Sequence, residues 1–195
     1  MVTLIINEML SRREKQEKLT KMNMVIGVFF SEAGTKLLKS LTEFDLDLDN
    51  VKDSFLINTN WQQKDFMRIE KILKNRNYTI DNSVRDLSEL KEFLLSKRLF
   101  FLDLLKNPNL LEHETFTDLL WAVFHLVEEL DKRKEVVNIP QPDYNHITGD
   151  IKRAYSLLMI EWLVYLKHLS VSYPYIFSLM VRTNPMDPYA TPEVK

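Results

Sequence analysis

The sequence predicts an all-α fold, a single domain that is a bundle of about six helices with a protruding N-terminal helix. Two observations predict it. The chain has only three glycines and seven prolines in 195 residues, so long segments run without a residue that breaks helices. Within those segments, apolar residues recur every three or four positions, which places them on one face of a helix.

Bulk composition excludes several classes of protein. The formal charge of −2 and the pI of about 6.1 offer no general attraction to nucleic acid, so no nucleic-acid partner is expected. The absence of cysteine excludes disulfides, thiol catalysis and cysteine-ligated metals, and it fits a cytoplasmic location. No apolar run approaches the roughly 18 to 20 residues that a membrane-spanning helix needs.

The first predicted helix covers residues 4–43 and has two unlike halves. Its early part is charged, and residues 11–18 contain no large apolar side chain, so this part should project from the body. Its later part is apolar, and Gly27, Ser31 and Gly34 are spaced to let another helix pack closely. We therefore divide the chain into a polar helical stalk, a helical bundle domain and an extended tail with prolines, at residues 1–20, 21–182 and 183–195.

The next two helices are predicted from apolar stripes and helix caps. An acidic segment with Asp45, Asp47 and Asp49 should form a solvated turn, because it lacks the glycine and terminal glutamate of a calcium loop. A helix capped within residues 58–60 follows it, and a further helix spans residues 86–106.

The last three helices are predicted at residues 114–137, 147–169 and 174–182. Pro140 and Pro142 separate the first two, which should therefore form an antiparallel hairpin. The tail after the last helix should be extended and poorly ordered unless it docks on the body.

Each helix of that hairpin has one polar residue in an otherwise apolar middle. His125 interrupts the first helix and Glu161 the second, and both are expected to be buried. If the turn is centred near Gln141, His125 lies opposite residue 157, one helical turn from Glu161. Because a buried carboxylate needs a partner, we expect these two side chains to form a structural pair.

A second interpretation makes this region a metal or acid–base site. Its residues would be His125, Glu129, Glu161 and Asp150. No Glu-x-x-His or His-Glu-x-x-His motif supports a metal, however, so no cofactor is predicted. His146 and Asp150 are also spaced i,i+4, which we interpret as an arrangement typical of a helix start.

Three segments stand out together: KMNMVIGVFFSEAGTKLL (21–38), DLLWAVFHLVEEL (118–130) and YPYIFSLMVRTNPMDP (173–188). They resemble an uncharacterised prokaryotic family of helical proteins, some of which carry a membrane anchor before this region. The resemblance implies no activity. It does imply that residues 1–18 form the stalk below such an anchor, where the basic residues would suit the cytoplasmic face. An ordinary amphipathic helix explains the same residues equally.

The function that we expect is a non-catalytic interaction or sensory domain. It would be cytoplasmic, or held at the inner face of the cell membrane by sequence upstream of Met1. The alternative is a metal-dependent or acid–base enzyme with its site around His125. The polar N-terminal helix should associate with a second copy or another protein, because an isolated polar helix is marginal in water.

Overall fold

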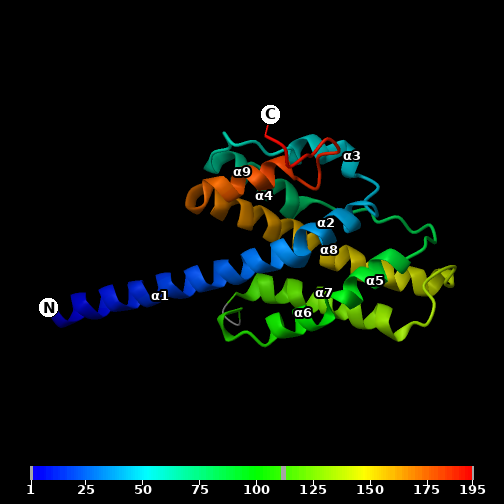
Figure 1. Cartoon of the computed structure of the whole chain (residues 1–195), viewed down its shortest axis with the longest axis horizontal. Coiled ribbons are helices and arrows are strands. Elements are labelled where there is room, and N and C mark those ends of the chain that lie inside the picture. Colours follow the sequence, from blue (N-terminus) through cyan, green and yellow to red (C-terminus); the bar gives the residue numbers. More distant parts are fainter. Residues whose placement is uncertain (1, 111–112, 195) are drawn as a thin grey trace.

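The computed structural model describes residues 2–110 and 113–194 and contains α-helices but no strand within those ranges. This confirms the all-α prediction (Figure 1). The helices are α1 (Val2–Phe29), α2 (Thr35–Thr42), α3 (Leu48–Val51), α4 (Gln63–Asn75), α5 (Ser88–Ser96), α6 (Arg98–Leu105), α7 (Glu114–Lys132), α8 (Gln141–Ser172) and α9 (Pro174–Arg182). In the same ranges, no helix is both long enough and apolar enough to cross a membrane.

The hairpin of α7 and α8 forms the centre of the bundle. These two helices share the most extensive packing, while α4, α2 and α9 pack on α8, and α5 and α6 pack on α7 (Figure 1). The largest fully buried side chains include Trp162, Tyr144, Tyr155, Phe29, Phe30, Phe101 and Phe116. Aromatic rings therefore join the end of α1 to both helices of the hairpin, since Phe29 packs edge-on against Phe116 and Phe30 stacks on Tyr165.

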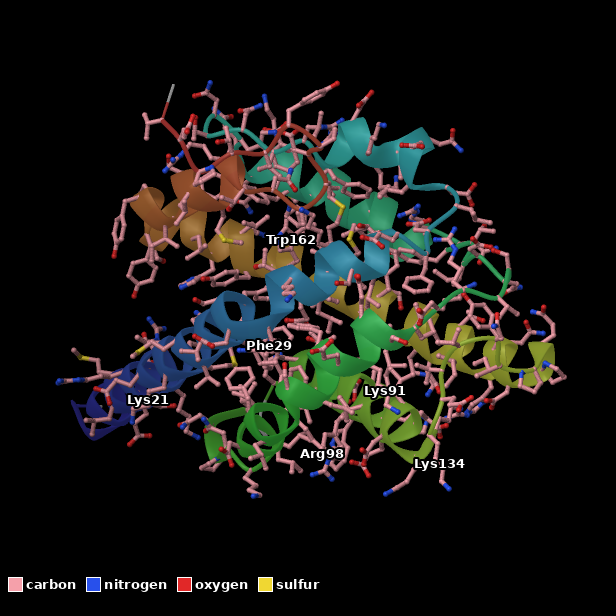
Figure 2. All side chains as sticks on the ribbon, turned by 45° about the vertical axis from the view of Figure 1, so that its right-hand side comes forward. Lys21, Phe29, Lys91, Arg98, Lys134 and Trp162 are labelled. Atoms are coloured by element: carbon pink, nitrogen blue, oxygen red, sulfur yellow. The ribbon has the colours of Figure 1, made fainter. Side chains whose placement is uncertain are left out.

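The first half of α1 projects from the body, which confirms the predicted protruding helix (Figure 1). Every described side chain from Glu8 to Lys21 is exposed, and burial begins only further along the helix. Figure 2 shows Phe29 among the side chains of the body and Lys21 on the projecting helix. The change follows the sequence, because residues 11–18 contain no large apolar side chain and such side chains become frequent again after Lys21.

The junction of α1 and α2 is one turn of π-helix, Phe30–Gly34, within an otherwise continuous helical run. A Cβ atom on Gly34 would lie only 2.6 Å from the Phe29 ring, so this turn requires glycine. A Cβ atom on Gly27 would lie 3.4 Å from the Tyr165 hydroxyl of α8, an ordinary contact, and Ser31 is exposed. Gly27 and Gly34 thus lie beside aromatic rings, whereas Ser31 lies at the surface.

Several helix boundaries differ from those predicted. The segment 86–106 is interrupted at Lys97, which leaves helical geometry with φ −102° and ψ 3°. Helix α8 begins at Gln141, not near residue 147, because Pro142 occupies its first turn, where proline costs no hydrogen bond. Helix α4 is capped by Gln62 and Asp65 in a capping box, downstream of the predicted caps.

The acidic segment before α3 is not wholly solvated, contrary to prediction. Asp45 is buried and its carboxylate lies 2.7 Å from the Arg76 guanidinium, which is itself buried. Arg76 also lies over the Tyr78 ring, and burial raises the pKa of Tyr78 to about 12. A buried charge needs such a partner, so only Asp49 behaves as the exposed acid that was expected.

The tail is docked through its first residues. Asn184 is buried and donates a hydrogen bond of 2.7 Å to the Phe55 carbonyl oxygen, while Met186 joins the core. The tail was predicted to be poorly ordered unless it docks on the body, and its first residues do dock there.

Candidate metal centre

The hairpin of α7 and α8 brings two matching pairs of residues together. His125 and Glu129 lie one turn apart on α7, and His146 and Asp150 lie one turn apart on α8. Because the helices run antiparallel, the histidine of each pair faces the carboxylate of the other. Among the described residues, these four side chains make up the group able to hold a metal ion, with ligand atoms within 4.8 Å of one another.

Three of the histidine–carboxylate distances are near those expected between ligands of one small metal ion. The two histidine Nε2 atoms lie 3.4 and 3.6 Å from Asp150 Oδ2, for His125 and His146 respectively. His125 Nε2 lies 3.8 Å from Glu129 Oε1, and His146 Nε2 lies 3.5 Å from the other oxygen, Glu129 Oε2. Ligands about 2.0 to 2.1 Å from a tetrahedral zinc ion stand about 3.3 to 3.4 Å apart. Ordinary hydrogen bonds between such groups are shorter, about 2.7 to 3.2 Å.

Asp150 is the buried anchor of the cluster. Its side chain is only 5% exposed, and its Oδ2 atom accepts no hydrogen bond from any described residue. The Arg153 guanidinium lies 3.5 Å away, but from the other carboxylate oxygen, Oδ1. A buried carboxylate oxygen without a hydrogen bond is costly, and either a protonated imidazole or a metal ion held with the two histidines would offset that cost.

Arg133 holds the opposite side of the cluster. Its guanidinium lies 2.7 Å from Glu129 Oε2 and 2.7 Å from Asp143 Oδ1, so it joins the end of α7 to the start of α8. The hydrogen bond from Arg133 lowers the pKa of Glu129, which keeps this carboxylate ionised and able to bind a metal. Such a partner outside the ligand set fixes the orientation of the ligand.

Three of the four residues proposed from the sequence meet here: His125, Glu129 and Asp150. The fourth member of the cluster is His146, whose spacing from Asp150 was interpreted as part of a helix start. His125 was predicted to be buried, but its side chain is 45% exposed at the edge of the hairpin. The repeated His-x-x-x-acid spacing on two antiparallel helices was the signal that could have identified the full set.

Glu161 does not reach His125, and the predicted pair between them is wrong. Its neighbours are Thr115 and His113 at the start of α7. The pairing of His125 with Asp150 centres the hairpin between residues 137 and 138, several positions before Gln141. Each residue of error in the centre shifts the facing residue by two, which moved the predicted partner of His125 by about two helical turns.

Glu161 is instead an isolated buried acid. It is 2% exposed, and its Oε2 atom has no hydrogen-bond partner among the described residues. Burial raises the pKa of Glu161, while a hydrogen bond from Thr115 and the nearby His113 oppose part of that rise.

A shallow hollow of about 480 Å³ adjoins the cluster. Its lining includes His125, Arg153 and Leu157, together with Trp121, whose large ring is exposed. The cluster and hollow together define the class: an all-α bundle whose central hairpin brings together two partly exposed histidines, one partly exposed carboxylate and one buried carboxylate.

The chain belongs to the family described as "Uncharacterized protein MJ1433, C-terminal helical domain", whose model matches residues 18–182. It is 46% identical over 187 residues to "Uncharacterized protein MJ1433" of Methanocaldococcus jannaschii, which covers 96% of this chain and 75% of that protein. No solved structure matches the chain. The family resemblance seen in the sequence is confirmed, and it brings no known activity with it.

Proposed function

We propose that this chain is a non-catalytic sensory and interaction domain whose α7–α8 hairpin binds one divalent transition-metal ion. The ligands are His125, Glu129, His146 and Asp150. The observation that carries the proposal is the buried Asp150 Oδ2 atom, which has no described hydrogen-bond partner and faces two imidazole nitrogens.

The donor set favours zinc or a neighbouring transition metal over magnesium or calcium. Imidazole nitrogen suits zinc, copper, iron and nickel, whereas magnesium and calcium prefer six or more oxygen ligands. Two histidines and two carboxylates whose ligand atoms lie within 4.8 Å of one another can supply the four ligands of four-coordinate zinc.

Sensing would work by joining the two central helices. Each helix supplies one histidine and one carboxylate, so a bound ion would tie α7 to α8 near their connecting loop. A ligand that binds only the folded hairpin stabilises it in proportion to the logarithm of its concentration. The loop between the helices and the surface beside Trp121 would then respond to metal concentration.

A metal-dependent or acid–base enzyme is the second candidate, and the hollow beside His125 is the observation that favours it. Catalytic zinc sites usually have three protein ligands and keep one position open, whereas structural sites have four. Four converging protein ligands therefore support the non-catalytic function.

For location, we propose the cytoplasm. If an upstream segment anchors α1, the protein would be attached to the inner face of the membrane. The lack of cysteine and the basic residues of the projecting helix support this proposal. Fractionation of cells that make the full native protein tests it, since recovery outside the cytoplasm or only on the outer face contradicts it.

The decisive experiment is a calorimetric titration of tag-free protein with zinc after removal of metal by a chelator. We expect one ion per chain, and a loss of at least about 100-fold in affinity for Asp150→Asn and for His146→Ala, because each removes a ligand. The matched control is His168→Ala, which removes a histidine outside the cluster and should bind like the parent. Absence of stoichiometric binding, or unchanged binding by both ligand variants, contradicts the proposal.

A further inference from the structure

One stripe of α1 has a spacing that alternates between three and four residues. Its members are Leu10, Arg13, Glu17, Thr20, Met24, Gly27 and Ser31. Positions with this alternation face a partner helix in a coiled coil, and here the large apolar members are Leu10 and Met24. Leu10, Glu17 and Met24 are exposed along it, so the bundle of the same chain leaves most of this face uncovered and approaches it at Gly27.

The C-terminal half of the stripe, from Thr20 to Ser31, borders a groove of about 610 Å³ between α1, α8 and the start of α9. The facing wall includes Tyr165, Tyr173 and Ile176. None of the described residues that line the groove is a lysine, arginine, aspartate or glutamate. The groove therefore suits a mainly apolar helix, and such a helix must come from outside this chain.

The stripe is complementary to itself when its direction is reversed. In an antiparallel pair of α1 helices centred at residue 15, Leu10 of one copy falls opposite Thr20 of the other, and Arg13 falls opposite Glu17. A parallel pair would place Arg13 against Arg13 and Glu17 against Glu17, with like charges facing each other. The charges thus favour the antiparallel arrangement.

We propose that two copies of this chain associate through antiparallel α1 helices, and that the first turns of each α1 occupy the groove of the other copy. The paired length from residue 6 to residue 24 is about 27 Å at 1.5 Å per residue. Because α1 projects away from the body, the two bundles would lie at opposite ends of the pair (Figure 1). This inference concerns the interaction part of the proposed function and does not involve the metal ligands.

The central charges also argue against a lipid bilayer as the occupant of this face. Arg13 and Glu17 lie on the same stripe as Leu10 and Met24, and both charged side chains are exposed. Opposite charges at the centre of a coiled coil set the register and direction of a protein partner, at some cost in affinity.

Cross-linking tests the register directly, because the natural chain has no cysteine. We expect an oxidised mixture of Leu10→Cys and Thr20→Cys full-length proteins to form a mixed covalent dimer, and neither variant to form one by itself. A covalent dimer of Leu10→Cys with itself would show parallel pairing and overturn the proposal.

Charge reversal tests the interaction by sedimentation over a range of protein concentrations. We expect Arg13→Glu to raise the dimer dissociation constant at least about tenfold, and adding Glu17→Arg to restore it, because the opposite charges then face each other again. Within each helix, Arg13 is also paired with Glu17, and Arg12 with Glu8 on another face. The matched control is therefore Arg12→Glu, which breaks an ion pair of the same kind and should leave the dissociation constant unchanged. The proposal is overturned if the parent protein is monomeric at every concentration, or if it binds phosphatidylglycerol vesicles and does not dimerise. In either case the zinc titration of each variant should match the parent, which keeps the two proposals separate.

Discussion

In the projecting half of α1 and in the α7–α8 hairpin, charged or titratable side chains are spaced four residues apart, but the spacing has a different outcome in each region. On α1, Glu8 and Arg12 stand four residues apart and form an exposed ion pair of 2.6 Å within one helix. On α7, His125 and Glu129 have the same spacing but lie 3.8 Å apart, and the second helix brings an equivalent pair to meet them. The spacing alone does not distinguish a solvated helix face from a site, because the neighbouring helix decides the outcome.

The two regions also differ in where the stability of the fold resides. The hairpin buries aromatic and aliphatic side chains on several sides, whereas the described side chains of α1 before Met22 remain exposed. Because burial of apolar surface is the dominant favourable contribution to folding, the free energy of unfolding should respond strongly to changes in the hairpin and weakly to changes in α1.

The largest expected effect is that of Phe116→Ala in α7. Phe116 is fully buried, and its ring centroid lies 5.2 Å from that of Phe29. The substitution should lower the free energy of unfolding by about 3 to 5 kcal/mol, through lost burial and the cavity left behind. Met9→Ala is the control on α1, where the change should stay within about 0.5 kcal/mol. Urea unfolding measures both, and similar losses would contradict the contrast between the two regions.

A smaller effect is expected from Glu161→Gln, and it should depend on pH. The pKa of Glu161 is raised in the folded state by burial, so its contribution is favourable at low pH and is lost as pH rises above the ordinary value of 4.5. Glutamine does not titrate. The variant should match the parent near pH 4 and exceed its free energy of unfolding by about 1 kcal/mol near pH 8.

Urea unfolding at several pH values, with a chelator present, tests this prediction. Glu128→Gln is the control, because Glu128 is partly exposed and paired with Arg98 at 2.8 Å. A parent protein whose stability does not fall relative to Glu161→Gln as pH rises would show that Glu161 is not a costly buried acid.

Most of the fold could be predicted from the sequence, because helical periodicity and scarce breakers are local signals. The short helix α9 was predicted at its observed bounds, and the hairpin was predicted from Pro140 and Pro142. The break at Lys97 and the burial of Asp45 could not be predicted in this way. No glycine or proline marks the break at Lys97, and the burial of Asp45 depends on Arg76, a partner distant in the sequence.

The candidate site was predicted in part, and the reason is the register of the hairpin. His125 was named because a single polar residue in an apolar helix stands out, Glu129 because it lies one turn further along that helix, and Asp150 as an additional acid of the second helix. His146 was missed and Glu161 was included because the centre of the loop was placed a few residues late. In an antiparallel pair that error doubles, so it exchanges one set of facing residues for another.

The smallest expected effect on stability is that of removing Met1 to Lys18, whose described side chains are all exposed. Their loss should shift the thermal midpoint by no more than a few degrees, because the family domain begins at residue 18 and the described side chains before it are exposed. The measurement belongs at low protein concentration, where the chain is monomeric, since association would otherwise add to the apparent stability of the parent. At high concentration the truncated protein should remain monomeric while the parent associates. If truncation unfolds the bundle at low concentration, this segment contributes to the core and the contrast with the hairpin is wrong.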